Sequence, residues 1–201
     1  MKQIILATRN TDKVTEIEDI MKLEHLKLVG IDAFPQAPDV VEDGQTLRAN
    51  ALKKARSAFS ATGVPAVADD TGLEVDALDG APGVYSSRLS GENATYADNN
   101  AKLLRMLQDV PREKRTARFR CVACLVDGDH EQFVEGVCEG IILQEIRGEE
   151  GFGYDPLFFL PQFGKTFAEL SLDEKNKISH RGRAFRGMAS VLRERYRERR
   201  L

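Results

Sequence analysis

The sequence predicts a protein of mixed helical and strand structure, and three features of its hydrophobic pattern support this. Short continuous apolar runs at residues 4–7 and 66–68 are typical of buried strands. Apolar residues at helical spacing follow within residues 14–21 and again within 47–58. Two longer strand-like segments flank an Asp-Gly-Asp turn at 127–129, which indicates an antiparallel hairpin.

The composition is that of an ordinary globular chain with little net charge. Its 201 residues are 42% hydrophobic and 30% charged, and 29 basic against 32 acidic side chains give a formal net charge of −3. We expect no nucleic-acid or membrane partner, because no global field attracts polyanions and no apolar stretch approaches the roughly 20 residues of a membrane helix. Without a signal-peptide pattern, a cytoplasmic location is expected. The three cysteines are predicted to be reduced core thiols.

The first predicted unit is a strand at 4–7, a polar loop at 8–13 and a helix. Backbone N–H groups at a helix N-terminus favour a phosphate, and Lys13 adds a positive charge. Helix capping by Asn10 or Thr11 explains the same residues without a ligand. The glycines of a Walker loop are missing from this loop.

A second strand is predicted at 26–31, and a proline-containing connection then leads to a helix with Thr46 as its N-cap. Asn50 and Lys54 lie one turn apart on that helix and therefore project from the same face. They are candidates to reach into a shared cleft. A solvated helix face is the alternative for the lysine.

The most unusual stretch places Asp69 and Asp70 directly after the apolar run 66–68, where we expect the strand to end. Adjacent carboxylates repel, so burying both ionised is costly unless a cation or hydrogen bonds compensate. Mg²⁺ accepts one or two carboxylates together with substrate phosphates and water. A solvated acidic turn is the alternative, and a separate strand is expected at 73–78.

The later elements begin with a helix that Thr95 and Asp98 introduce as a capping box, followed by strands at 116–126 and 132–146. Residues 151–156 then combine two glycines, two aromatic residues and an acid, which suits a flat ligand such as a purine. A tight turn with buried aromatic rings is the alternative.

The last segment is a core-packed helix that follows a Ser-His-Arg sequence at 179–181. Arg181 offers a rigid donor fork for a carbonyl edge or a phosphate, whereas a lone histidine is more often structural. The arginine-rich stretch 193–200 is predicted to be a solvated helix end.

Four motifs in this order resemble the inosine triphosphate pyrophosphatase family, whose members are also called XTP/dITP diphosphatases. They are Ala-Thr-Arg-Asn at 7–10 with Lys13 and Glu16, Ala-Asp-Asp-Thr-Gly-Leu at 68–73, Phe-Gly-Tyr-Asp-Pro at 152–156, and Ser-His-Arg-Gly at 179–182. Each motif alone is weak, but together they span essentially the whole chain. The resemblance implies a single pyrophosphatase domain over 1–201 with an α/β fold: a long mixed central sheet, flanking helices and two lobes around an active-site cleft. It also implies a homodimer.

The resemblance further implies a role for each site residue. Glu42 and Asp70 would bind Mg²⁺, and Asp70 would be the catalytic residue that accepts the proton of the attacking water. Thr8, Asn10 and Lys13 would hold the phosphates with the help of Lys54. Residues 152–155 with Lys175 would form the base pocket, and His180 and Arg181 would face the purine. The implied substrate-binding residues are Thr8, Arg9, Asn10, Thr11, Asp12, Lys13, Lys54, Thr71, Phe152, Gly153, Tyr154, Asp155, Lys175, His180 and Arg181.

The implied reaction is the Mg²⁺-dependent hydrolysis of the altered purine nucleoside triphosphates ITP, dITP and XTP to the monophosphate and pyrophosphate. The chain departs from the family pattern at Arg9, at Thr71 and at Ala49, which removes a carboxylate from a position that is often acidic. One alternative is a pyrophosphatase for modified pyrimidine triphosphates. Another is a non-catalytic nucleotide- or RNA-binding module, although carboxylates repel phosphate unless a cation bridges them.

Overall fold

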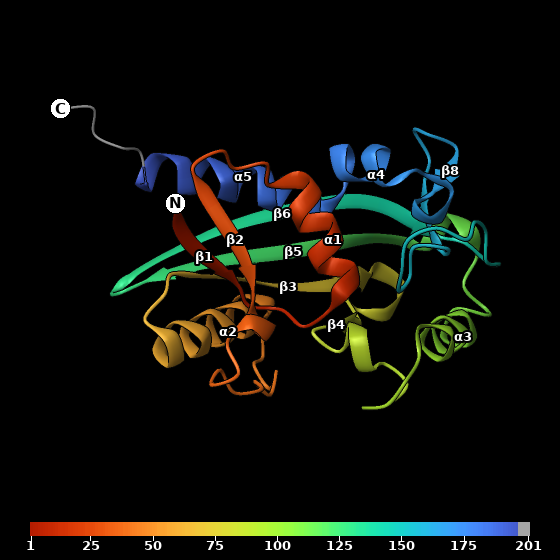
Figure 1. Cartoon of the computed structure of the whole chain (residues 1–201). Helices are drawn as coiled ribbons and strands as arrows, with labels where there is room; N and C mark the ends of the chain where they lie inside the picture. Colours follow the sequence, from red (N-terminus) through yellow and green to blue (C-terminus); the bar gives the residue numbers. More distant parts are fainter. Residues whose placement is uncertain (197–201) are drawn as a thin grey trace. The chain divides into compact units, whose positions relative to one another are not determined.

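The computed structural model describes residues 1–196, and its strands form a mixed sheet in the order β2-β1-β3-β5-β6-β7-β8 (Figure 1). Strand β1 (Lys2–Leu6) pairs in parallel with β2 (Leu26–Gly30) and with β3 (Ala66–Val75). Antiparallel pairs join β3 to β4 (Pro82–Gly83), β6 to β7, and β7 to β8. The remaining strands are β5 (Thr116–Asp127), β6 (His130–Ile142), β7 (Phe158–Leu160) and β8 (Lys165–Thr166). The α/β prediction with a mixed central sheet is confirmed.

The chain divides into two compact units, and each is assembled from separate segments. Among the described residues, the first unit contains 1–70, 121–136 and 181–196, and the second contains 71–120 and 137–180. Strands β3, β5 and β6 therefore contribute residues to both units. The implied single domain over 1–201 stays a prediction.

In the first unit, helices cover both faces of the strands (Figure 1). Alternate residues of β1 point to opposite faces, and Ile4 packs in one cluster with Ile17 of α1 (Thr11–Ile20) and Phe185 of α5 (His180–Arg195). Helix α2 (Leu47–Thr62) lies on the other face. Local chemistry sets the helix ends: Asn10 and Thr46 are the N-caps of α1 and α2, and Gly63 ends α2 in the left-handed conformation at φ 68°.

The second unit has its own core, in which Leu73, Leu103, Phe119, Phe158 and Phe167 are buried. Its helices are α3 (Tyr96–Met106) and α4 (Leu172–Ile178), and the predicted capping box at the start of α3 is confirmed.

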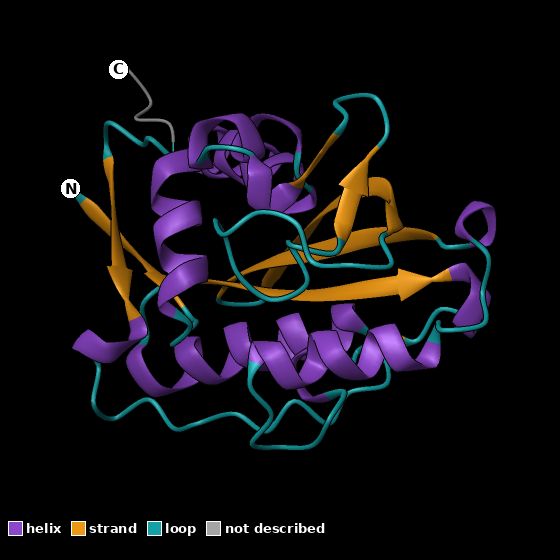
Figure 2. Ribbon diagram, turned by 90° about the vertical axis from the view of Figure 1, so that its right-hand side faces the viewer, coloured by secondary structure: helices purple, strands orange, loops and turns teal. Residues whose placement is uncertain are grey.

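Short 3-10 helices are present in both units, at η1 (Ile31–Ala33), η2 (Asp76–Leu78), η3 (Ser86–Arg88), η4 (Arg112–Lys114) and η5 (Phe167–Glu169). Figure 2 distinguishes the helices, strands and loops by colour.

The predicted hairpin and the C-terminal helix are present, but the predicted strand bounds are wrong at β3 and at β6, and one helix was missed. Strand β3 does not end at residue 68: it continues through both aspartates to Val75, and 76–78 is a 3-10 helix. Strand β6 ends at Ile142, where its pairing with β7 ends, so residues 143–146 lie outside it. Helix α4 was not predicted, because seven residues are too few for an apolar period.

Two further sequence predictions concern cysteines and the C-terminal end. Cys121, Cys124 and Cys138 are buried, and within the described residues none of them forms a disulfide, as predicted. Of the arginine-rich stretch, residues 197–200 lie outside the described residues. No helix within 1–196 is long and apolar enough to cross a membrane.

Candidate active site

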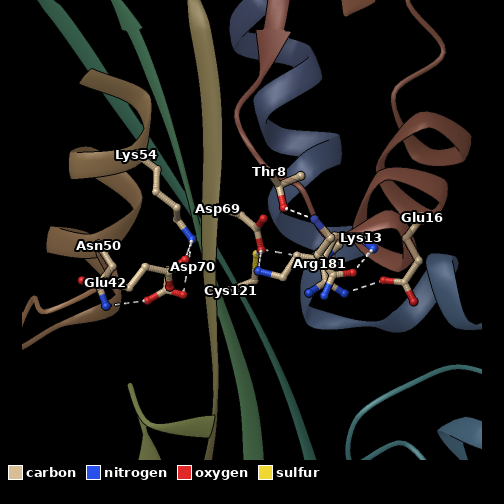
Figure 3. Close-up of polar contacts among 11 residues, drawn as sticks. Thr8, Lys13, Glu16, Glu42, Asn50, Lys54, Asp69, Asp70, Cys121 and Arg181 are labelled. Carbon is tan, nitrogen blue, oxygen red and sulfur yellow. Dashed lines mark hydrogen bonds and ion pairs between the residues drawn. The ribbon is translucent and has the colours of Figure 1, made fainter. Parts of the chain in front are cut away.

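Asp69 and Asp70 lie on opposite faces of β3, so the two neighbouring carboxylates occupy separate environments (Figure 3). Successive side chains of a strand alternate in direction, and both aspartates are buried. Asp69 points toward Lys13 of α1 and Arg181 of α5, whereas Asp70 points toward Asn50 and Lys54 of α2. The repulsion expected between the two carboxylates is therefore relieved by the strand itself, which explains why β3 continues through them.

On the Asp69 face, buried charges form an ion network. Lys13 Nζ lies 3.1 Å from Asp69 Oδ2, and Arg181 Nε lies 3.8 Å from the same oxygen. Arg181 is also ion-paired with the buried Glu16 of α1. Burial tends to raise the pKa of Asp69, but Lys13 and Arg181 outweigh it and hold this pKa well below its usual value. Asp69 is thus a permanently ionised carboxylate at physiological pH.

On the Asp70 face, α2 contacts both carboxylate oxygens. Asn50 Nδ2 donates to Asp70 Oδ2 at 3.0 Å, and Lys54 Nζ lies 3.7 Å from Asp70 Oδ1 and 2.8 Å from Glu42 Oε1. Burial raises the pKa of Asp70 to about 6; Lys54 and Lys13 oppose the rise, and Glu42 adds to it. Burial also tends to raise the pKa of Glu42, but Lys54 outweighs this effect and lowers it. Asp70 is therefore the carboxylate of this pair that exchanges a proton near neutral pH.

The donor set at Glu42 and Asp70 fits Mg²⁺. Both side chains provide hard oxygen atoms, and both contact the same Lys54 ammonium group. In the described part of the chain no group of three or more His, Cys, Asp or Glu side chains could hold a metal ion. A cation at Glu42 and Asp70 would therefore complete its shell with phosphate and water oxygens, which is the usual habit of Mg²⁺.

The predicted phosphate-binding residues Thr8 to Lys13 form the loop between β1 and α1 and the first turn of α1. Asn10 Oδ1 accepts from Lys13 N at 3.1 Å, so Asn10 caps the helix, and Thr8 Oγ1 accepts from Asn10 N at 3.2 Å. Thr11 and Asp12 are the first two residues of α1. The capping explanation is thus confirmed, and it leaves Lys13 on the same face of β3 as Asp69.

Arg9, the departure from the family pattern, is tied to the connection that leads from β2 to α2. Its guanidinium group donates to the carboxylates of Asp32 and Asp39 and to Ala37 O at 3.2 Å. The two ion pairs are exposed, so each contributes little stability.

In the second unit, the predicted base-pocket residues form one turn before β7. The carboxylate of Asp155 accepts from Phe152 N at 2.8 Å and is ion-paired with the buried Lys175 of α4. Lys175 Nζ also lies 4.9 Å from the centre of the Phe152 ring. Gly153 and Tyr154 complete this ordered turn.

Further hydrogen bonds of the second unit hold this turn in place, and two more of the predicted substrate-binding residues lie in the same unit. Asn100 Nδ2 of α3 donates to Gly153 O at 2.9 Å, and Tyr154 Oη donates to Ser86 O at 2.8 Å. His180 stacks on Phe119 with ring centres 4.6 Å apart, which is a core contact. Thr71 lies in β3.

Sequence reasoning assigned no role to Glu16 and only a general one to Asn50. The sequence does hint at a buried role for Glu16, because this charged residue precedes the apolar Ile17 and shares a helix face with Lys13. Asn50 contacts both Asp70 and the backbone of Gly44, and no pattern in the sequence predicts the second contact.

Comparisons with known proteins find relatives that match nearly the whole chain. Residues 4–191 match the Ham1 family. A "dITP/XTP pyrophosphatase" of Desulforamulus reducens is 50% identical over 195 residues, covering 96% of this chain and 97% of the relative. Another "dITP/XTP pyrophosphatase", from Nitratidesulfovibrio vulgaris, is 54% identical over 196 residues and covers 94% of each chain.

A solved structure of a HAM1 protein from Coxiella burnetii has the same fold. It superimposes with a TM-score of 0.89 at 43% identity, covering 96% of this chain and 100% of that one. With a family match across the motifs that hold Lys13, Asp70 and Asp155, and with relatives of near-equal length, the chain belongs to the Ham1 family.

Proposed function

We propose that this protein is a magnesium-dependent nucleoside triphosphate pyrophosphatase that hydrolyses dITP, ITP and XTP to the monophosphate and pyrophosphate. The observation that carries the proposal is the group formed by Glu42, Lys54 and Asp70 on one face of β3. Two carboxylates beside a lysine suit a polyanionic substrate only when a cation accompanies it. Relatives named "dITP/XTP pyrophosphatase" that share half of their residues with this chain support the same reaction.

The residues of the first unit act on the triphosphate. Lys13 and Lys54 bind phosphate oxygens, and the N-terminus of α1 adds oriented N–H groups. Glu42 and Asp70 would hold Mg²⁺, which when bound neutralises phosphate charge and lowers the pKa of a coordinated water. Asp70 accepts the proton of the attacking water as the bond between the α- and β-phosphates breaks. Without a metal, burial makes Asp70 a stronger base than an ordinary aspartate; a bound Mg²⁺ would lower its pKa again, so orienting the attacking water is the second part of its role.

We assign base recognition to the second unit, on the turn formed by residues 152–155 and held by Lys175. Buried polar groups in this turn discriminate bases, because the wrong exocyclic group leaves a donor or acceptor without a partner. In the first unit, Arg181 is assigned to the purine from the resemblance alone, with Glu16 fixing its guanidinium group. The homodimer and the cytoplasmic location stay predictions.

Pyrophosphate release from a panel of nucleoside triphosphates tests the proposal. The panel contains dITP, ITP, XTP, dATP, dGTP and modified pyrimidine triphosphates, each with Mg²⁺ or with excess EDTA. We expect Mg²⁺-dependent release that is fastest from dITP, ITP and XTP. Preferential release from the pyrimidine nucleotides would favour the pyrimidine alternative, and binding without release from any nucleotide would favour a non-catalytic module.

A further inference from the structure

Asn50 is fully buried in α2, and both ends of its side-chain amide are engaged within the first unit. Nδ2 donates to Asp70 Oδ2 at 3.0 Å, and Oδ1 accepts from the backbone N–H of Gly44 at 2.7 Å (Figure 3 shows the first contact). An ionised carboxylate only accepts and a backbone N–H only donates. The amide therefore has one satisfactory orientation, because the flipped one would oppose donor to donor and acceptor to acceptor.

The backbone of the loop before α2 packs directly on this amide. A Cβ atom at Gly44 would lie 2.5 Å from Asn50 Oδ1 and 3.0 Å from Ala49 Cβ. Any side chain at position 44 would thus push the loop away from Asn50. Glu42 is two residues earlier in the same loop, so the bond from Gly44 to Asn50 fixes the segment that carries Glu42.

We infer that Asn50 is a positioning residue that sets the relative placement of Glu42 and Asp70. One end of its amide fixes the rotation of the Asp70 carboxylate, and the other end anchors the Glu42 loop through Gly44. Lys54, one turn later on the same helix, contacts both carboxylates from the same face. The inference rests on the proposed function, because it concerns the two residues that would hold Mg²⁺.

The geometry matters because Mg²⁺ demands near-ideal octahedral coordination at 2.0–2.1 Å from its ligands. A misplacement of about 1 Å in a catalytic group costs about 10²-fold in rate. The Asn50 amide is well placed to prevent both a rotation of one carboxylate and a shift of the other.

Two substitutions separate the functions of the two ends of the amide. Asn50→Ala removes both hydrogen bonds. Asn50→Asp keeps an acceptor for Gly44 N but replaces the donor to Asp70 by a second carboxylate oxygen. The matched control is Asn99→Ala: Asn99 is buried in α3, accepts from Ser90 N at 2.8 Å, donates to Ser87 O at 3.0 Å, and has no carboxylate among these partners.

For each variant we would measure kcat and KM for dITP at saturating Mg²⁺, the unfolding temperature, and binding of Mn²⁺ to the nucleotide-free protein by electron paramagnetic resonance. We expect Asn50→Ala to lower kcat about 10²-fold and to weaken Mn²⁺ binding, and Asn50→Asp to lower kcat more than 10-fold. Asn99→Ala should lower the unfolding temperature comparably while keeping kcat and Mn²⁺ binding.

Either of two results would overturn the inference: a kcat that follows the unfolding temperature equally in Asn50→Ala and Asn99→Ala, or wild-type kcat in Asn50→Asp. Failure of the proposed function is a different result. In that case the wild-type protein would release no pyrophosphate from any nucleotide, while the comparison of Mn²⁺ binding would still test whether Asn50 places the carboxylates.

Discussion

Replacing Asp70 by asparagine is expected to abolish turnover and, at the same time, to stabilise the folded protein. Burial, with the neighbouring Glu42 adding to it, raises the pKa of Asp70 from 3.8 to about 6. A shift of about two pKa units corresponds to about 3 kcal/mol, at about 1.4 kcal/mol per unit. This is the cost of keeping the carboxylate ionised in the folded protein at neutral pH, before any cation is present.

The sign follows from proton binding. Between pH 3.8 and about 6 the folded state holds more protons on Asp70 than the unfolded state, so the free energy of unfolding falls as pH rises through this range. Asparagine is always neutral and still offers an oxygen to Asn50 Nδ2. Asp70→Asn should therefore be more stable than the wild type by up to about 3 kcal/mol at pH 7.5, and by less than about 1 kcal/mol at pH 4.

Urea unfolding of the metal-free protein at both pH values measures this difference, and Asp69→Asn is the matched control. Burial tends to raise the pKa of Asp69, but Lys13 and Arg181 lower it well below its usual value, so this carboxylate stabilises the fold at neutral pH. Asp69→Asn should consequently be less stable than the wild type at pH 7.5. An Asp70→Asn protein that is less stable than the wild type at pH 7.5, or that turns over normally, would refute the reasoning.

Three more predictions concern other parts of the chain. Arg115→Ala should lower the free energy of unfolding in urea by about 2–4 kcal/mol. The reason is that the buried guanidinium group donates to the carbonyl oxygens of residues 107, 110 and 143. A loss below about 1 kcal/mol would contradict this role. Lys175→Met should remove the ion pair of the buried Asp155 carboxylate, which lowers the unfolding temperature and the ratio of kcat/KM for dITP over dATP. An unchanged ratio would separate Lys175 from base recognition. Excess EDTA should stop pyrophosphate release while circular dichroism shows the protein still folded, since both cores consist of packed hydrophobic side chains. Release that persists in EDTA would exclude the role of Mg²⁺.

The local chemistry of the sequence predicted many element ends correctly. Asn10, Thr46 and Thr95 were identified as cap residues because a cap depends on side chains within three residues of it. The continuity of β3 was not predictable in the same way. Two adjacent aspartates resemble a turn, and the partners that stabilise Asp69 inside the strand, Lys13 and Arg181, come from the two ends of the chain.

The candidate site likewise contains contacts that the sequence predicted and contacts that it did not. The motif resemblance identified Asp70, Glu42 and Lys54, which the structure brings together on one face of β3. It also pointed to His180, whose ring packs against Phe119, and the role of His180 toward the base stays a prediction. The contact between Asn50 and Gly44 joins a helix to an irregular loop, and the path of such a loop is not encoded in any short pattern.

The alternation of Asp69 and Asp70 makes the pairing register of β3 a determinant of the proposed chemistry. Ile5 and Leu6 of β1 lie opposite Ala66 and Val67 of β3, and this register decides which carboxylate meets α2. A slip of one residue would place Asp70 on the face of Lys13 and Arg181, and Asp69 on the face of α2. An insertion or deletion of one residue between Val67 and Asp69 would therefore interchange the two chemical environments while keeping both aspartates in the strand.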